Sequence, residues 1–172
     1  MNQCPDPADQ PRPVPAGDQP PHPRPAANLL RPYLRRTQDW ARFDDQAARA
    51  EGLSEDLLRV GREVNRFGGQ LAAPEGQERE LLPGFHGNWC GPGHSGPGEP
   101  VDRLDAACMA HDLCYRDDGY FNRDCDLALL RAIESDWDDY TRRQRFAAAA
   151  IYAVFTLKTG WSGAGAPVEE PY

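Results

Sequence analysis

Apolar positions recur at helical spacing along two stretches in the first half of the chain. The first stretch begins at Pro32, a suitable first helical residue, and ends at Glu51 and Gly52. Its stripe is mostly apolar and comprises Tyr33, Leu34, Thr37, Trp40, Ala41, Asp44, Ala47 and Ala48. The second stretch has Ser54 as its N-cap and carries apolar residues at Leu53, Leu57, Val60, Val64 and Phe67. The pattern predicts an N-terminal helical pair within residues 29–69, which serves mainly as core and could also wall the entrance to a site.

Two further helices are predicted in the middle of the chain. Asp102 can cap the first of them, and Gly119 terminates it. Asn122 can cap the next, which runs to about Trp137 and continues one apolar face through Leu129, Leu130 and Ile133. Because only a short turn separates the two helices, we expect them to lie antiparallel.

The last predicted helix is the most apolar segment of the chain. Thr141 and Gln144 form a capping box at its start, and Gly160 ends it. Residues 146–157 are apolar nearly all round, but this run is too short to span a bilayer. We therefore expect a buried core helix, with a lipid-contacting surface as the alternative.

Segments rich in proline or in polar residues surround these helices. Residues 1–28 contain nine prolines and almost no large apolar residues, which predicts a disordered tail. Residues 70–83 have the composition of a linker, and residues 161–172 that of a C-terminal tail. A chain of 172 residues allows one domain with tails, so the expected fold is mainly α, with residues 84–160 as its core unit.

Residues that can do chemistry share one face of the helix that Asp102 begins. Cys108, His111, Asp112 and Tyr115 are spaced three, four and seven residues apart, so they project together from one side. A base (His111), a carboxylate (Asp112) and a phenol (Tyr115) therefore point toward the same neighbouring part of the fold.

The loop WCGPGHSG before this helix has the composition of a cation site. Its glycines permit backbone conformations in which carbonyl oxygens converge on an ion, and calcium prefers such oxygens together with one or two carboxylates. Asp112 could supply the carboxylate, and Trp89, Gly91 and Gly93 could supply carbonyls. A disulfide from Cys90 to Cys108 would fold the loop over His111 and Asp112.

A second carboxylate could complete a general base. Cys114 projects away from the His111 face and could form a bridge to Cys125, which would clamp the two central helices together. Asp126 would then lie near His111. A carboxylate behind an imidazole fixes its tautomer and orientation, the usual arrangement of a general base.

These motifs resemble those of a known family. The run WCGPG, a Pro-x-Asp-x-x-Asp approach and Cys-x-x-His-Asp-x-Cys-Tyr are followed by Cys-Asp, and they occupy about forty of the 172 residues. The approach comprises Pro100, Asp102 and Asp105. In this order the motifs resemble the calcium-dependent secreted phospholipases A2, in a compact, microbial-style form.

The resemblance implies a role for each site residue. His111 would draw a proton from a water that attacks the sn-2 ester of a phospholipid, with Asp126 as its partner and Tyr115 bonded to Asp126. Asp112 and the carbonyls of Trp89, Gly91 and Gly93 would hold Ca²⁺, and the Gly91 N–H would stabilise the oxyanion.

The sequence departs from the animal pattern in several places. The loop after Gly93 is about two residues longer, so the third carbonyl ligand could shift to His94 or a neighbour. Ala107 replaces a cysteine often found in the family. The β-hairpin wing is absent, and with it the second tyrosine that would brace Asp126.

Charge narrows the choice of partners. The net charge of −8 argues against nucleic acid and weakens binding to anionic membranes, so a zwitterionic phospholipid membrane or micelle surface is the expected peripheral partner. No protein partner is indicated. Arginine outnumbers lysine eighteen to one, which we interpret as genomic base composition.

Five cysteines leave Cys4 unpaired if both bridges form. Structural disulfides indicate an oxidising compartment and hence a secreted or otherwise extracytoplasmic protein. Residues 1–28 lack the apolar segment of a signal peptide, so the export route is left open.

Three other interpretations use the same residues. A zinc site could take Cys108, His111 and Cys114 with Cys90 or Cys125, although helical spacing sets these cysteines on different flanks. A serine hydrolase could use the stretch of Gly93, His94 and Ser95, but Pro97 stands where the nucleophile elbow needs glycine. A non-catalytic phospholipase A2-like binding module or toxin component is the third.

Overall fold

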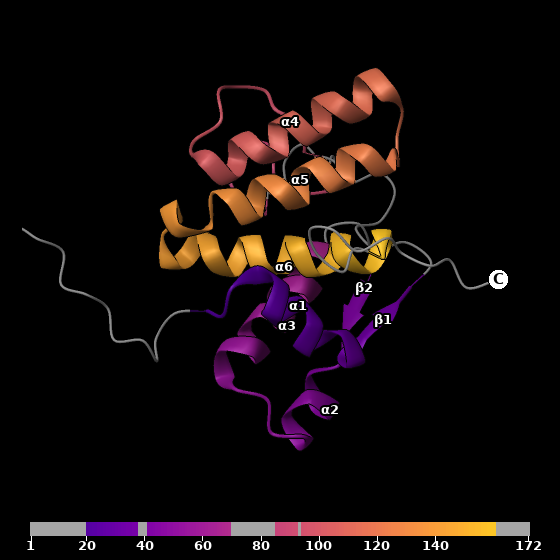
Figure 1. Ribbon diagram of the computed structural model, residues 1–172, viewed down its shortest axis with the longest axis vertical. Coiled ribbons are helices and arrows are strands. Elements are labelled where there is room, and N and C mark those ends of the chain that lie inside the picture. The colour runs from indigo at the N-terminus through magenta and orange to yellow at the C-terminus, as the bar shows by residue number, and fades with distance from the viewer. Residues whose placement is uncertain (1–19, 38–40, 70–84, 93, 161–172) are drawn as a thin grey trace, which may run out of the picture.

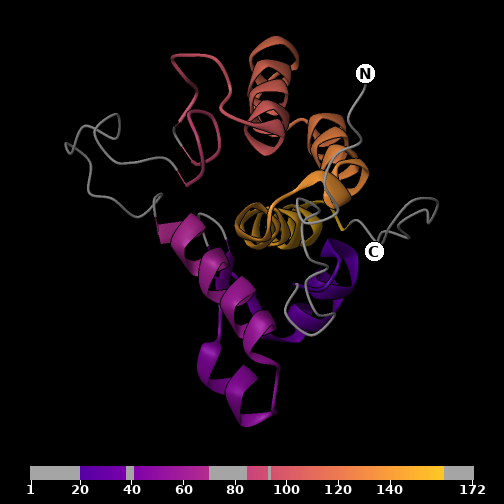
Figure 2. The same ribbon diagram turned by 90° about the vertical axis from the view of Figure 1, so that its left-hand side faces the viewer.

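Helix α6 (Arg142–Thr159) lies at the centre of the molecule, with helices packed on both sides (Figures 1 and 2). The computed structural model describes residues 20–37, 41–69, 85–92 and 94–160. Every side chain of α6 from Phe146 to Phe155 is buried. The prediction of a buried core helix is therefore confirmed, and the capping box of Thr141 and Gln144 is present at its start. None of the described helices is long and apolar enough to cross a membrane.

Helices α4 (Arg103–Asp118) and α5 (Arg123–Ser135) form a layer on one side of α6 (Figure 1). Both begin at the predicted caps, because Asp102 accepts from the Asp105 N–H at 3.0 Å and Asn122 accepts from the Asp124 N–H at 2.9 Å. Gly119 ends α4 with a φ of 97°, a conformation that glycine adopts without strain. A short 3-10 helix, Trp137–Asp139, connects α5 to α6.

Helix α3 (Glu55–Gly69) packs against the other side of α6. Four of the five predicted apolar positions are buried: Leu57, Val60, Val64 and Phe67. The N-terminal part of the predicted core is therefore confirmed at this helix. The predicted linker of residues 70–83 lies outside the described residues.

Helix α1 (Pro23–Leu30) overturns part of the predicted disordered tail. Proline is tolerated in the first helical turn because that turn needs no N–H donor, and both Pro23 and Pro25 stand there. Ala26, Ala27 and Leu30 are buried, and α1 packs on α6. The prediction of a tail up to residue 28 is thus wrong from Pro23 onward, whereas residues 1–19 and 161–172 lie outside the described residues.

The single helix predicted from Pro32 to about residue 50 is also wrong. A 3-10 turn (Arg31–Tyr33) leads instead into strand β1 (Leu34–Arg36), which pairs antiparallel with β2 (Ala41–Phe43) before helix α2 (Asp45–Ala50). Along β2, burial alternates, with Ala41 and Phe43 inward and Arg42 exposed. Phe43 is not part of the predicted helical stripe, so the alternation along β2 differs from the predicted helical spacing, and tertiary packing decides the local structure.

Close packing on α3 explains that outcome. The Phe43 ring occupies the space beside Gly61, where a Cβ atom would lie 2.3 Å from the ring. The Asn65 side chain accepts from the Phe43 N–H at 2.8 Å and donates to the Phe43 carbonyl at 3.0 Å. These bonds satisfy the edge of β2 and fix the hairpin to α3.

Candidate catalytic site between helices α4, α5 and α6

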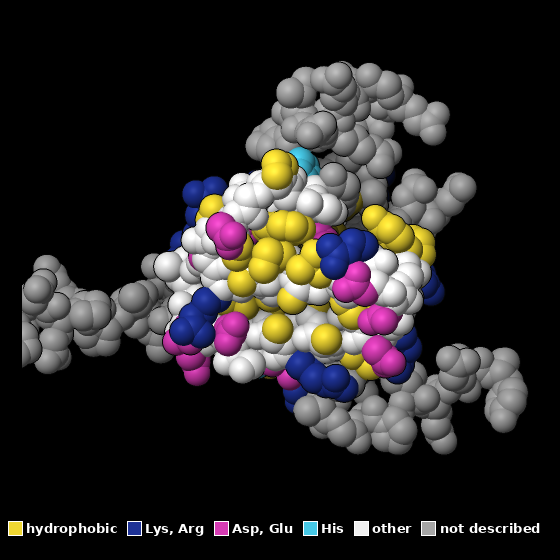
Figure 3. All heavy atoms as spheres, turned by 90° about the horizontal axis from the view of Figure 1, so that it is seen from above, with side chains coloured by type: hydrophobic (Ala, Val, Ile, Leu, Met, Phe, Trp, Pro, Cys, Tyr) yellow, Lys and Arg dark blue, Asp and Glu magenta, His cyan; other side chains and the backbone are white. Residues whose placement is uncertain are grey.

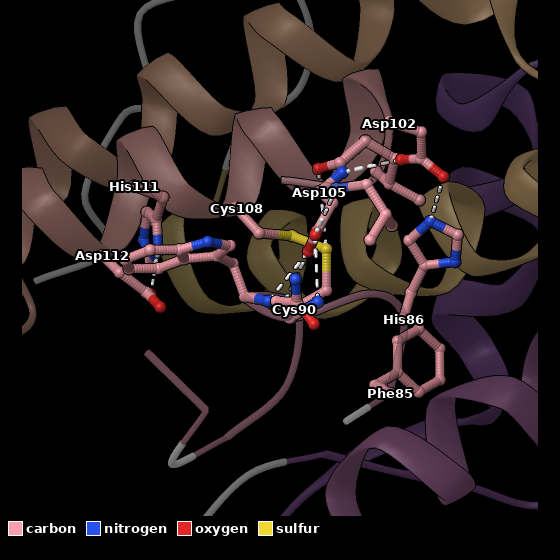
Figure 4. The surroundings of a disulfide bond; sticks show 12 residues. Phe85, His86, Cys90, Asp102, Asp105, Cys108, His111 and Asp112 are labelled. Carbon is pink, nitrogen blue, oxygen red and sulfur yellow. Dashed lines mark hydrogen bonds and ion pairs between the residues drawn. A yellow bond between two sulfur atoms is a disulfide. The ribbon is translucent and has the colours of Figure 1, made fainter. Parts of the chain in front are cut away.

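Two disulfides organise the site. Cys90 is bonded to Cys108 and Cys114 to Cys125, so both predicted bridges are confirmed. The first joins the Gly-rich loop to α4 beside His111 and Asp112, as Figure 4 shows, and the second joins α4 to α5. Because the sulfur atoms are consumed in disulfides, these cysteines cannot form the zinc site considered above. Cys4 lies outside the described residues.

Asp105 holds both ends of the loop. Its carboxylate is fully buried and accepts four backbone N–H groups: those of Asn88 at 2.9 Å, Trp89 at 2.8 Å, Cys90 at 3.3 Å and Val101 at 3.0 Å. Gly87 permits this approach, since a Cβ there would lie 2.2 Å from the carboxyl carbon. The sequence marked Asp105 only as part of a motif. Nothing in its spacing revealed this loop-holding role, because three of the four donors lie 15 to 17 residues away along the chain.

The described part of the loop is further tied to itself. The Trp89 indole donates to the Gly98 carbonyl at 2.9 Å, and the Gly91 carbonyl accepts from the His94 N–H at 3.1 Å. A carbonyl oxygen has two lone pairs, so Gly91 retains one for another partner. Gly91 has a φ of 145°, which favours glycine. Gly93 lies outside the described residues.

His111 and Asp126 face each other in the core of the site. The distance from His111 Nε2 to Asp126 Oδ1 is 3.0 Å, and the two residues are 8% and 1% exposed. The other ring nitrogen, Nδ1, lies 3.6 Å from Asp112 Oδ1. The imidazole is therefore held at one nitrogen and turned toward Asp112 at the other.

Two further groups bind the Asp126 carboxylate. The Tyr115 hydroxyl donates to Oδ1, and the Lys158 ammonium lies 2.7 Å from Oδ2. Lys158, in the last turn of α6, also donates to the Tyr115 hydroxyl. Lys158 lies 32 positions beyond Asp126, so sequence spacing did not point to it, although one signal was available: it is the only lysine beside eighteen arginines.

The surroundings set the charge of each group. Burial raises the pKa of Asp126, but hydrogen bonds from His111, Lys158 and Tyr115 outweigh it and leave the pKa below its usual value. Burial and the neighbouring Asp126 raise the pKa of Tyr115, so its hydroxyl stays protonated. Burial lowers the pKa of His111, yet the nearby carboxylate of Asp112 and the hydrogen bond to Asp126 produce a net increase. The result is an ionised carboxylate with a neutral phenol donor.

Aromatic side chains line the site and extend to the surface. The His111 ring packs edge-on against Phe155 of α6, with ring centroids 5.0 Å apart. Tyr120 and Phe121, in the turn between α4 and α5, are 78% and 69% exposed. Figure 3 shows hydrophobic side chains gathered over the middle of one face, with charged side chains around them.

The Asp112 carboxylate has the property expected of a metal ligand. Its Oδ2 atom is buried and has no hydrogen-bond partner among the described residues. Buried polar atoms are normally satisfied, so an orphaned carboxylate oxygen fits a group that binds a cation. Among the described residues, Cys114, Asp118 and Cys125 also form a cluster of potential metal ligands, but the two cysteine sulfur atoms are already bonded to each other.

The serine hydrolase interpretation finds no support in the geometry. A nucleophile elbow requires a strand directly before the serine. In the described ranges the strands are β1 and β2, which lie far from Ser95 along the chain. His94 and Ser95 belong to the loop that Asp105 holds.

Several curated proteins are similar to part of this chain. A mouse protein named phospholipase A2, membrane associated, is 36% identical over 59 residues, which are 34% of this chain and 39% of that protein. The Arabidopsis thaliana protein phospholipase A2-beta is 46% identical over 50 residues, 28% of this chain and 34% of its own length. A rice protein named probable phospholipase A2 homolog 2 is 47% identical over 53 residues, 28% of this chain and 35% of its own length.

The chain thus spans between 34% and 39% of the length of these three relatives. No protein-family model matches the chain, and no solved structure does. The chain is mainly helical and carries both expected disulfides, which is consistent with a compact fold of this type. Over about a third of the chain, the similarity confirms the resemblance to the phospholipase A2 family that the loop and the His-Asp motif indicated.

Proposed function

We propose that the protein hydrolyses the sn-2 ester of glycerophospholipids in a calcium-dependent reaction, releasing a free fatty acid and a lysophospholipid. One observation carries the proposal: the buried His111 ring is bound to Asp126 at one nitrogen and faces Asp112 at the other, where a buried carboxylate oxygen has no partner in the described part of the chain. The similarity to proteins named phospholipase A2 supports the same reaction class.

His111 acts as the general base. Because the ionised Asp126 carboxylate can only accept, Nε2 of the neutral ring carries the proton that faces Oδ1, and Nδ1 is left to accept a proton from water. The resulting hydroxide attacks the ester carbon, and the imidazolium is stabilised by the ionised Asp126. Nδ1 then returns the proton to the departing alkoxide of the lysophospholipid. Water is consumed and no covalent acyl-enzyme forms.

Asp112 and the carbonyls of Trp89, Gly91 and Gly93 are the proposed calcium ligands. Bound calcium would supply Lewis acidity that polarises the ester carbonyl. The Gly91 N–H is the proposed donor to the oxyanion. Asp105 fixes the loop through the Trp89 and Cys90 N–H groups, so the loop would lose less conformational entropy when its carbonyl oxygens bind calcium.

The turn between α4 and α5 is the proposed contact with a phospholipid surface. Tyr120 and Phe121 expose their rings near Tyr115 of the site. Aromatic rings suit the boundary between lipid headgroups and acyl chains. The net charge of −8 favours zwitterionic over anionic lipid. The two disulfides support a secreted location.

The test is fatty-acid release from phosphatidylcholine with calcium or with a chelator. His111→Gln should slow release at least about 100-fold, the contribution typical of a general base. His22→Gln is the matched control, because that imidazole lies beside Trp137 and outside the site. Equal turnover by His111→Gln would refute the base assignment. An inactive wild type that still binds calcium and vesicles would indicate a binding module instead.

A further inference from the structure

The contacts of Lys158 extend the site beyond the motifs of the central helices. Lys158 and Phe155 are three residues apart on α6, so they project from one face of that helix. The Phe155 ring packs on His111, and the Lys158 ammonium reaches Asp126 and Tyr115. One turn of helix α6 therefore contributes both an aromatic ring, Phe155, and a cation, Lys158, to the site.

The two oxygens of Asp126 have different partners. Oδ1 accepts from both His111 Nε2 and the Tyr115 hydroxyl. Oδ2 lies 2.7 Å from the Lys158 ammonium. Without Lys158, a carboxylate that is 1% exposed would lose the cation that faces Oδ2, and with it one of the contacts that fix its orientation toward the imidazole.

Lys158 also directs the Tyr115 hydroxyl. An ammonium can only donate, so its bond to the hydroxyl oxygen leaves the hydroxyl proton for Asp126. The ammonium lies 5.1 Å from the Tyr115 ring centroid and 5.4 Å from that of Phe155, close enough for cation–π attraction. The Lys158 side chain is 21% exposed, so these contacts largely replace water around the charge.

We infer that Lys158 is a positioning residue of the hydrolytic site: through Asp126 Oδ2 and the Tyr115 hydroxyl, it fixes the carboxylate that orients His111. The inference rests on the proposed function.

The kinetic test compares Lys158→Met, which keeps the length of the side chain and removes the charge, with wild type on a short-chain phospholipid dispersed as monomers. We expect kcat to fall about 10- to 100-fold, as for a misplaced catalytic group, while KM and calcium affinity change less than about threefold. Arg24→Met is the matched control, because Arg24 forms an ion pair with Glu134 that joins α1 to α5 away from the site. It should lower stability and leave kcat unchanged.

Two kinetic outcomes would overturn the inference. One is a kcat for Lys158→Met within twofold of wild type. The other is an equal loss of kcat in Arg24→Met, which would show that loosened packing alone slows the reaction. If the wild type itself releases no fatty acid, the proposed function fails, and the following spectroscopic test still applies.

The spectroscopic test uses the fact that Lys158 is the only lysine of the sequence, so lysine labelled with ¹⁵N gives a single side-chain ammonium signal. In the folded wild-type protein, we expect ammonium protons protected from exchange with water and a shift of the signal in Asp126→Asn. A rapidly exchanging signal that Asp126→Asn leaves unchanged would overturn the inference even if Lys158→Met failed to fold.

Discussion

Replacing Asp105 by asparagine should disrupt the loop while leaving the proposed catalytic side chains intact. In wild type, Asp105 Oδ1 accepts from the Trp89 and Cys90 N–H groups, and Oδ2 accepts from those of Asn88 and Val101. An asparagine can accept with its oxygen only, so its NH₂ group must face two of these donors in either orientation.

The expected loss follows from those bonds. A hydrogen bond to a charged group contributes about 1.5–3 kcal/mol, so losing two should cost about 3–6 kcal/mol. This is a large part of a typical domain stability of about 5–15 kcal/mol. Because the Cys90–Cys108 disulfide still ties the loop to α4, we expect part of the loss to appear as a disordered loop, with calcium affinity reduced along with stability.

The assay is denaturant unfolding together with calcium titration. Asp124→Asn is the matched control, because it removes the same charge from an exposed position in the first turn of α5 and should change stability by at most about 1 kcal/mol. If Asp105→Asn lost less than about 1 kcal/mol and bound calcium as wild type does, the carboxylate would not hold the loop in the way described here.

Three further perturbations probe packing, charge and the lipid surface. Gly61→Ala should lower the free energy of unfolding by about 1–3 kcal/mol, because its Cβ would lie 2.3 Å from the Phe43 ring of β2. Gly69→Ala is the control and should not destabilise the protein, because nothing lies within 4 Å of its Cβ position. Equal stabilities of the two variants would contradict the close packing at Gly61. The folded pKa of His111 is raised above 6.5, so without calcium its protonation adds stability below pH 6.5 that is lost as the pH rises through the folded pKa. The difference in unfolding free energy between wild type and His111→Gln should shrink over that window, and a difference independent of pH would refute the raised pKa. Replacing both Tyr120 and Phe121 by serine should weaken binding to phosphatidylcholine vesicles at least about tenfold and spare hydrolysis of dispersed lipid; unchanged vesicle binding would exclude this turn as the contact.

The sequence predicted the part of the molecule whose signals are local. The caps of α4, α5 and α6 are side chains that bond to a backbone N–H two or three residues away, so a short window of sequence contains them. The two disulfides were also predictable, because cysteines on opposite flanks of one helix can each reach only a limited set of partners. The family motifs supplied the expected roles of His111 and Asp126, which stay predictions.

Long-range packing explains what the sequence did not predict. Helix α1 forms in a proline-rich segment because its prolines fall in the first turn and its alanines pack on α6. The β1–β2 hairpin replaces an expected helix because Phe43 fits against Gly61 and Asn65 satisfies the strand edge. Lys158 meets Asp126 only through the packing of α6 beside α5, and sequence spacing does not record that contact.

The most direct test of the central claim uses phosphatidylcholine with different acyl chains at the sn-1 and sn-2 positions, incubated with the purified protein in calcium and, in parallel, in excess chelator. Mass spectrometry would identify the released fatty acid. We predict release of the sn-2 chain only, and only with calcium. Release of the sn-1 chain, or equal release of the sn-2 chain in chelator, would contradict it.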